Sequence, residues 1–143
     1  MPRATVRIRV PFVDVDSSER IHFTAVMRYW EVAEHALMRS LGLPYATALQ
    51  EVAFPRVHVS ADFKGAIGFD DELDVEARIE RVGSTSWTIA FTARPADAGD
   101  EAPALAVGRM TVVAMDRATQ RPAPLPADLR RALTGEDAPA PRQ

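Results

Sequence analysis

At 143 residues, with 47% hydrophobic and 26% charged side chains, the sequence is typical of one globular domain with a substantial buried core. The net charge of −3 argues against a nucleic-acid-binding protein, and the absence of cysteine excludes disulfides, a thiolate nucleophile and cysteine metal sites. The sequence shows no signal peptide and no apolar run near the ~18 residues of a membrane span, so we expect a cytoplasmic protein with no membrane partner.

The N-terminal third contains a predicted strand, a polar loop and a long helix. Residues 5–13 alternate between apolar and polar side chains, which predicts a half-buried strand. The loop that follows contains two aspartates, Asp14 and Asp16. Residues 24–41 then carry apolar side chains at helical spacing, and we expect the hydroxyl of Thr24 to cap this helix. The helix has only a narrow polar face, made of Arg28, Glu31, His35 and Arg39.

The rest of the chain is predicted to be mostly strand. Gly42 and Pro44 end the helix, and residues 45–52 are expected to form a short, partly helical excursion. The apolar period then changes to two, and glycine-, serine- and aspartate-rich turns separate four predicted strands at residues 54–64, 73–80, 85–94 and 104–115. The last of these is apolar on both faces apart from Arg109, which predicts a central strand. A final helical turn is predicted at residues 128–133.

This order of elements predicts the fold class. Consecutive strands joined by short turns form an antiparallel sheet. A helix with so few polar positions must be covered by other elements. We therefore expect an α+β fold in which one long central helix is wrapped by a curved antiparallel sheet of about five strands. The domain is expected to span residues 1–135 and to be followed by a mobile tail at 136–143.

The loop before the helix is the candidate site. The first turn and a half of the helix contains no acidic side chain, so its exposed amides and its dipole can stabilise a negatively charged oxygen. A carboxylate beside such amides is the arrangement for attack on a carbonyl group. However, residues 16–19, D-S-S-E, also match a capping box in which Asp16 only accepts backbone amides. The pattern alone leaves both interpretations open.

A family resemblance favours the catalytic interpretation. The stretch RIRVPFVDVDSSERIHFTAVMRYWEVAEHALMRSLGL resembles the active-site segment of the 4-hydroxybenzoyl-CoA thioesterase-like family of hotdog-fold acyl-CoA thioesterases. The resemblance continues through FPRVHVSADFKGAIGFDDELDVEARIERVGSTSW, AVGRMTVVAMD and PLPADLRRAL, and so covers nearly the whole chain. It implies the hotdog fold, assembly into a homodimer through a continuous sheet or into a homotetramer of two dimers, and acyl pockets at the subunit interface.

The resemblance also implies residue roles. The family motif is D-x-D-x-x-G followed by an aromatic-rich helix start, and its nucleophile or general base falls on Asp16. The backbone amide that polarises the thioester carbonyl falls on Phe23. We expect Thr24, Met27 and Trp30 to contact the substrate. The implied reaction is hydrolysis of an acyl or aroyl thioester of CoA or of an acyl-carrier protein, which releases a free acid and a thiol.

The sequence departs from the family pattern at two places. The family glycine after the aspartates is Glu19 here, and the small polar residue often found near the helix start is Ala25. In addition, the basic cluster that binds CoA phosphates in some relatives is missing between the third and fourth strands. Two alternatives stay open: an enoyl-thioester hydratase or dehydratase that uses Asp16 with His22, six residues further on, and a non-catalytic acyl-binding protein, which Glu19 makes conceivable.

Some hotdog thioesterases use a helix glutamate in place of the loop aspartate, and Glu31 and Glu34 lie on this helix; we favour the interpretation in which Glu31, His35 and Arg39 form an i,i+4 ladder on its polar face. Three scattered histidines predict no metal site, and no cofactor is expected.

Overall fold

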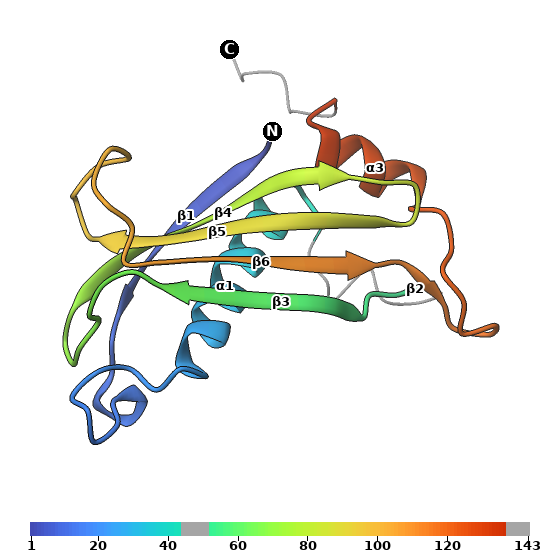
Figure 1. The fold of residues 1–143 in the computed structure, drawn as a ribbon. Coiled ribbons are helices and arrows are strands. Elements are labelled where there is room, and N and C mark those ends of the chain that lie inside the picture. The colour runs from blue at the N-terminus through green and yellow to red at the C-terminus, as the bar shows by residue number, and fades with distance from the viewer. Residues whose placement is uncertain (44–51, 137–143) are drawn as a thin grey trace, which may run out of the picture.

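The computed structural model of the protein describes residues 1–43 and 52–136, and its main feature is a five-stranded antiparallel sheet with helix α1 against one face (Figure 1). The elements in chain order are β1 (Arg3–Arg9), η1 (Phe12–Asp14), α1 (Ala25–Ser40), β2 (Val52–Ala53), β3 (Arg56–Phe63), β4 (Glu72–Val82), β5 (Ser86–Pro95), β6 (Ala106–Val113), β7 (Met115–Asp116) and α3 (Ala127–Thr134). The strand order in the main sheet is β1-β4-β5-β6-β3, and β2 pairs separately with β7. The predicted long helix and the four predicted later strands are thus all present in the described part of the chain.

Helix α1 lies across the sheet because one of its faces is almost wholly apolar. The buried members of this face are Ala25, Val26, Tyr29, Trp30, Ala33, Leu37 and Met38. The predicted polar positions Arg28, Glu31 and Arg39 are exposed. Val32 is apolar, but its side chain is 47% exposed. The helix packs most extensively against β1 and β4, and Trp30 also reaches β5 and β3.

The inner faces of β4 and β5 form the centre of the core. Alternate residues of these strands are fully buried, as the period of two predicted: Leu73, Val75, Ala77 and Ile79 on β4, and Trp87, Ile89 and Phe91 on β5. The Trp30 ring stacks on Phe91 with a centroid distance of 5.1 Å, and its Nε1 donates to the carbonyl of Ser60 at 3.2 Å. Gly108 lies directly beneath this contact, where a Cβ would stand 2.2 Å from the Ser60 oxygen. A glycine is therefore required at position 108 by the close approach of α1.

Two predicted features differ from the structure. The first strand ends at Arg9, because Pro11 has no amide to offer the sheet and residues Phe12–Asp14 coil into a 3-10 turn. Phe12 is consequently 73% exposed instead of facing the helix. The segment 64–71 was expected to be a turn between neighbouring strands, but β3 and β4 are separated by β5 and β6. This segment therefore crosses the end of the sheet and reaches the loop that precedes α1.

The two edge strands carry different side chains. On β1, three arginines face acidic residues of β4 in an arginine ladder, which we define as the pairs Arg3–Glu76, Arg7–Asp74 and Arg9–Glu72. On β3, the apolar side chains of Val57, Val59 and Phe63 are 63%, 41% and 47% exposed. One edge strand thus presents a row of paired charges, and the other presents exposed apolar side chains among its polar ones.

The C-terminal part is also helical, so the described chain contains two α-helices and not a single one. The turn predicted at 128–133 is the eight-residue helix α3, whose Leu129 and Leu133 are buried and which packs against β4. Of the excursion predicted at 45–52 only Val52 lies within the described residues, and of the tail at 136–143 only Glu136 does. Within the described residues, neither helix has the length and apolarity that a membrane crossing requires.

Candidate active site

The loop between β1 and α1 is anchored by Asp14, whose side chain is buried under the start of the helix. Oδ2 of Asp14 accepts a hydrogen bond of 2.7 Å from the hydroxyl of Tyr29, and Oδ1 pairs with the guanidinium of Arg28. Burial and the neighbouring carboxylate raise the pKa of Tyr29, so its hydroxyl stays protonated and keeps donating. The backbone carbonyl of Asp14 also accepts from the amide of His22 at 2.7 Å. Asp14 therefore fixes the loop to α1 with both carboxylate oxygens.

The second aspartate of the motif, Asp16, is exposed. Its Oδ1 accepts hydrogen bonds from the hydroxyl and, at 2.8 Å, from the amide of Ser18. These two bonds, with a smaller contribution from His22, hold the pKa of Asp16 below its usual range, so the carboxylate is ionised at neutral pH. Within residues 1–43 and 52–136, Oδ2 accepts no hydrogen bond. Asp16 thus accepts the backbone amide that the capping interpretation predicted, but this turn uses only Oδ1 and leaves Oδ2 free.

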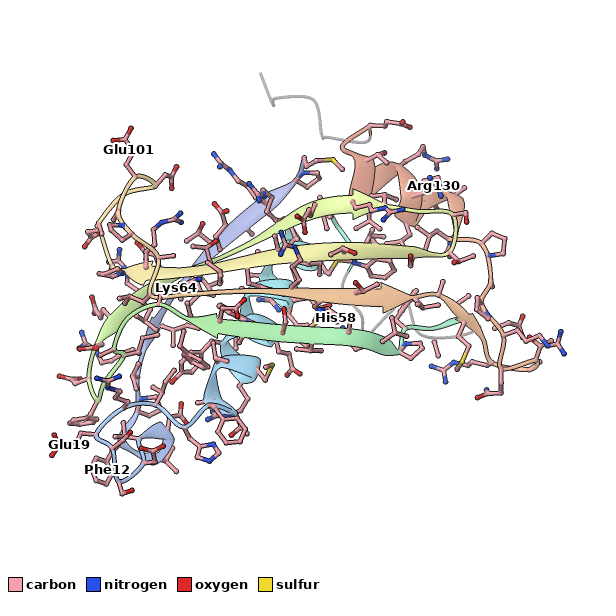
Figure 2. All side chains as sticks on the ribbon, viewed as in Figure 1. Phe12, Glu19, His58, Lys64, Glu101 and Arg130 are labelled. Carbon is pink, nitrogen blue, oxygen red and sulfur yellow. The ribbon has the colours of Figure 1, made fainter. Side chains whose placement is uncertain are left out.

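Glu19 stands where the family motif has glycine, and its backbone keeps the conformation that glycine favours. Its φ is +64°, in the left-handed region, where an L side chain is strained. The turn is closed by a 3.0 Å hydrogen bond from its amide to the carbonyl of Asp16 and by another from the Asp16 amide to the carbonyl of Arg20. The replacement has therefore kept the turn, with strain, and has placed an additional carboxylate at its exposed tip (Figure 2).

The mouth of α1 lies next to this turn. Thr24 is the N-cap residue, but its hydroxyl does not cap the helix; it contacts Nδ1 of His22 at 2.7 Å. The Thr24 amide also donates to that nitrogen at 3.2 Å, so both the hydroxyl and the amide of Thr24 are engaged with His22. The Phe23 amide makes no hydrogen bond to any residue in the described part of the chain. The first turn of α1 holds no acidic residue, so this free amide sits at an electropositive helix end.

Asp16 and Phe23 line one surface pocket of about 220 Å³. Its walls come from the loop before α1 and from the crossing segment after β3, and they consist of Asp16, Ser18, Arg20, Ile21, Phe23, Phe63, Gly65 and Ile67. A 2.9 Å hydrogen bond from the Ile21 amide to the Ile67 carbonyl holds the two walls together. The carboxylate and the helix mouth thus face the same cavity, at the end of the molecule that Figure 2 marks with Phe12 and Glu19.

The other predicted substrate contacts lie farther inside. Met27 is partly buried and packs against the hydrophobic core. Trp30 is fully buried, because its ring is stacked on Phe91 and its N–H is bound to Ser60. Trp30 therefore belongs to the core of this chain and does not line the pocket, in contrast to the role expected for it. Thr24 is exposed at the helix mouth, next to the pocket but not among the residues that line it.

Sequence reasoning missed three features around the site. Arg20 and the pocket wall at Phe63–Ile67 were not predicted, because nothing local in the sequence shows that the crossing segment reaches the loop before α1. The structural role of Asp14 was not predicted, although its two partners, Arg28 and Tyr29, follow one another near the start of the helix. Glu34 is fully buried and pairs with Arg56 at 2.7 Å, so it joins α1 to β3 and is not a surface residue.

Histidines do not gather at the pocket. His58 is exposed in the middle of β3 (Figure 2), as expected for a residue on the face of the sheet. His22 is exposed and its Nδ1 is engaged with Thr24. In residues 1–43 and 52–136, no three histidine, cysteine or carboxylate side chains lie close enough together to hold a metal ion.

Comparisons with known proteins give the fold and the family of the chain. The sequence profile of the thioesterase-like superfamily matches residues 4–133. The solved 1,4-dihydroxy-2-naphthoyl-CoA thioesterase of Synechocystis superposes with a TM-score of 0.84 at 22% identity, over 96% of this chain and 99% of that one. The DHNA-CoA thioesterase of Staphylococcus aureus superposes with a TM-score of 0.83 at 16% identity, over 96% and 93%.

A sequence relative points the same way. The chain is 31% identical over 94 residues to a 1,4-dihydroxy-2-naphthoyl-CoA hydrolase of Prochlorococcus marinus. This match covers 59% of the chain and 62% of the relative, which is less than two thirds of the relative's length. The chain belongs to the thioesterase-like superfamily, and its assignment to the thioester hydrolases is confirmed at the level of the family.

Proposed function

We propose that the protein hydrolyses an acyl or aroyl thioester, with Asp16 as nucleophile or general base and the Phe23 amide as oxyanion donor. The observation that carries this proposal is that the free oxygen of Asp16 and the unbonded amide of Phe23 belong to residues that line one pocket. The low pKa of Asp16 supports the ionised form that either role needs. Asp14, the other aspartate of the motif, has both oxygens engaged with α1.

The chemistry follows from these positions. The thioester carbon is attacked either by Asp16 or by a water molecule whose proton Asp16 accepts. The carbonyl oxygen becomes negatively charged, and the Phe23 amide and the dipole of α1 stabilise it. Collapse of this intermediate breaks the carbon–sulfur bond, and the leaving thiolate takes up a proton. In the nucleophilic route, water then hydrolyses the acyl–Asp16 anhydride and regenerates the carboxylate.

CoA is the carrier that the comparisons favour. The named relatives act on naphthoyl-CoA thioesters, and aromatic side chains at Phe23 and Phe63 line the pocket of this chain. An acyl-carrier protein stays as the second carrier. We therefore propose an aroyl-CoA or acyl-CoA as substrate. A thiol-release screen with aliphatic and aromatic acyl groups, each on CoA and on an acyl-carrier protein, identifies the preferred acyl group and the preferred carrier.

We further propose that the protein acts as a homodimer joined through β3, or as a tetramer of such dimers. The support is the apolar edge at β3, where Val57 and Val59 are largely exposed and Phe63 is also a wall of the pocket. Pairing of two β3 strands would bury these side chains and bring a second chain to each pocket. Light scattering after size-exclusion chromatography tests this assembly, and Val59→Lys should yield monomers.

The central experiment compares Asp16→Asn with the wild type in a thiol-release assay. We expect turnover to fall by at least ~10²-fold without loss of folded structure, because the substitution removes the nucleophile or base. Asp97→Asn serves as a matched control, since Asp97 is an exposed loop aspartate whose surface ion pair contributes little stability. Wild-type turnover in Asp16→Asn would refute the assignment.

The same assay separates the two alternatives. A hydratase would consume an enoyl thioester, seen by ultraviolet absorbance, without releasing thiol, and would depend on His22. A non-catalytic acyl-binding protein would bind the thioester saturably and release no thiol.

A further inference from the structure

The pocket beside Asp16 contains one cationic side chain that the proposed reaction does not use. Among the described residues that line the pocket, Arg20 carries the positive charge and Asp16 the negative charge. The Arg20 guanidinium makes no ion pair with any residue in 1–43 or 52–136. Other arginines of the described chain are paired with carboxylates, namely Arg3, Arg7, Arg9, Arg28, Arg56, Arg109 and Arg131. An unpaired guanidinium in a pocket wall is free to bind an anion from outside the chain.

Arg20 does not serve to neutralise Asp16. The carboxylate of Asp16 is satisfied at Oδ1 by Ser18, and the charge that further stabilises it comes from His22. The backbone nevertheless brings the two residues together, because the Asp16 amide donates to the Arg20 carbonyl at 3.0 Å across the turn. Arg20 and Asp16 thus begin from adjacent points of the main chain and reach the pocket side by side.

Because Arg20 and Asp16 line the same pocket, we can infer which anionic group of the substrate Arg20 binds. If Asp16 attacks the thioester carbon, a group bound by Arg20 lies only a few bonds from that carbon. The phosphates of CoA are separated from the thioester by the whole pantetheine arm, whereas a substituent of the acyl group is close. The remaining walls include Ile21, Phe23 and Phe63, which suit the apolar part of an acyl or aroyl group.

We propose that Arg20 is a specificity-determining residue that selects thioesters whose acyl group carries a carboxylate, which it binds through its forked N–H groups. This inference rests on the proposed thioesterase function. The planar guanidinium donates two parallel hydrogen bonds to a carboxylate, which a lysine ammonium cannot do. In this role Arg20 binds a substituent of the acyl group and makes no bond to the reacting carbon or sulfur, so it acts on substrate choice and not on the chemical step.

The test uses acyl groups matched in size, with and without a carboxylate. Glutaryl is compared with valeryl, and 3-carboxybenzoyl with benzoyl, each as the CoA thioester and as the N-acetylcysteamine thioester, which has no phosphate. In Arg20→Gln, we expect the preference in kcat/KM for the carboxylated member of each pair to fall by about tenfold on both thiols. Arg20→Lys should retain part of the preference.

Arg78→Gln is the matched control. It removes one exposed positive charge from β4, six residues along the strand from Glu72 and so about 20 Å from the start of that strand. The substitution should leave the preference unchanged.

Three outcomes would overturn the inference. The first is an unchanged preference in Arg20→Gln. The second is a loss confined to CoA thioesters and equal for both acyl groups, which would assign Arg20 to the carrier phosphates. The third comes from calorimetric binding of glutaryl-CoA and valeryl-CoA to the Asp16→Asn protein: equal affinities would refute the inference whether or not the wild type hydrolyses thioesters. The thiol-release assay with Asp16→Asn tests the proposed function separately.

Discussion

The hydroxyl of Tyr29 lies 2.7 Å from Oδ2 of Asp14, and this hydrogen bond ties the loop that carries Asp16 to the second turn of α1. The carboxylate is 1% exposed, so water cannot replace the donor if the hydroxyl is lost. The two aspartates of the D-x-D motif thus have different environments: Asp14 is buried and fully bonded, whereas Asp16 is exposed with one free oxygen. The buried aspartate positions the exposed one.

The first prediction concerns this contact. Tyr29→Phe should lower the free energy of unfolding by about 1–3 kcal/mol, because a buried carboxylate oxygen loses its donor. It should also lower turnover, since the loop that holds Asp16 loses an attachment. Arg28→Gln is the comparison, and it should also destabilise the protein, because it removes the counter-charge of the same buried carboxylate although the Arg28 side chain itself is 59% exposed. Urea unfolding measures both variants, and equal stability of Tyr29→Phe and wild type would contradict the role of the bond.

A second prediction concerns pH. Ser18 stabilises the charged form of Asp16, so Ser18→Ala should raise the pKa of Asp16 toward the usual ~3.9. In the wild type, a pKa lower in the folded than in the unfolded state means that this carboxylate stabilises the fold above its unfolded pKa. That contribution is lost as pH falls through the lower folded value. The 13C shift of the Asp16 carboxyl, titrated by NMR and assigned with Asp16→Asn, measures the change; a pKa that does not move would show that Ser18 is not the cause.

A third prediction concerns Glu19. Glu19→Gly should raise the free energy of unfolding by about 0.5–1 kcal/mol, because relief of the left-handed strain exceeds the entropy cost of glycine. It should also alter KM for anionic substrates, since a negative charge leaves the turn beside the pocket. Asp97→Gly removes similar strain at φ +64° in another loop, and should raise stability without changing KM. Thermal unfolding and steady-state kinetics provide the two readouts; a less stable Glu19→Gly protein would argue that the glutamate has a stabilising contact.

A fourth prediction concerns the packing of α1 on the sheet. Gly108→Ala should destabilise the protein by at least about 1–3 kcal/mol, because the new methyl group would overlap the Ser60 carbonyl and the Trp30 ring. The indole N–H resonance of Trp30 should shift as its bond to Ser60 lengthens. Gly83→Ala is the control, since a Cβ there meets its nearest neighbours at an ordinary 3.4 Å. If both alanine variants unfold at the same temperature, the close approach at Gly108 is not limiting.

The sequence predicted the strands well because burial of one face or of both faces leaves a characteristic pattern of apolar residues. The alternating residues 73–80 form β4. Residues 104–115, which are apolar on both faces, contain β6, and β6 is an interior strand. The sequence could not predict the strand order, since the hydrophobic pattern of 54–64 is the same for an edge and an interior strand. Val57 is 63% exposed because β3 lies at the edge of the sheet and has a neighbouring strand on one side only.

The candidate site was predictable only in part. Asp16 and Phe23 were predicted from the family motif. A motif can locate both residues because the turn and the start of the helix are adjacent in sequence. Thr24 was expected to cap the helix from local preference, but its hydroxyl contacts the neighbouring imidazole of His22 instead of the amides of the first turn. The position of Arg20 in the pocket wall was not predicted. The pocket forms between the loop before α1 and the crossing segment after β3, and no local sequence pattern indicates that these two segments meet.

The arginine ladder on β1 has a consequence for how copies of this chain can associate. A strand adding beside β1 would have to strip water from a row of guanidinium and carboxylate groups, which disfavours open-ended stacking at that border. The opposite border offers valines and a phenylalanine instead. If two chains pair through β3 as proposed, the closed pair leaves β1 as its outer edge strand, and the charges on that strand disfavour further growth of the sheet.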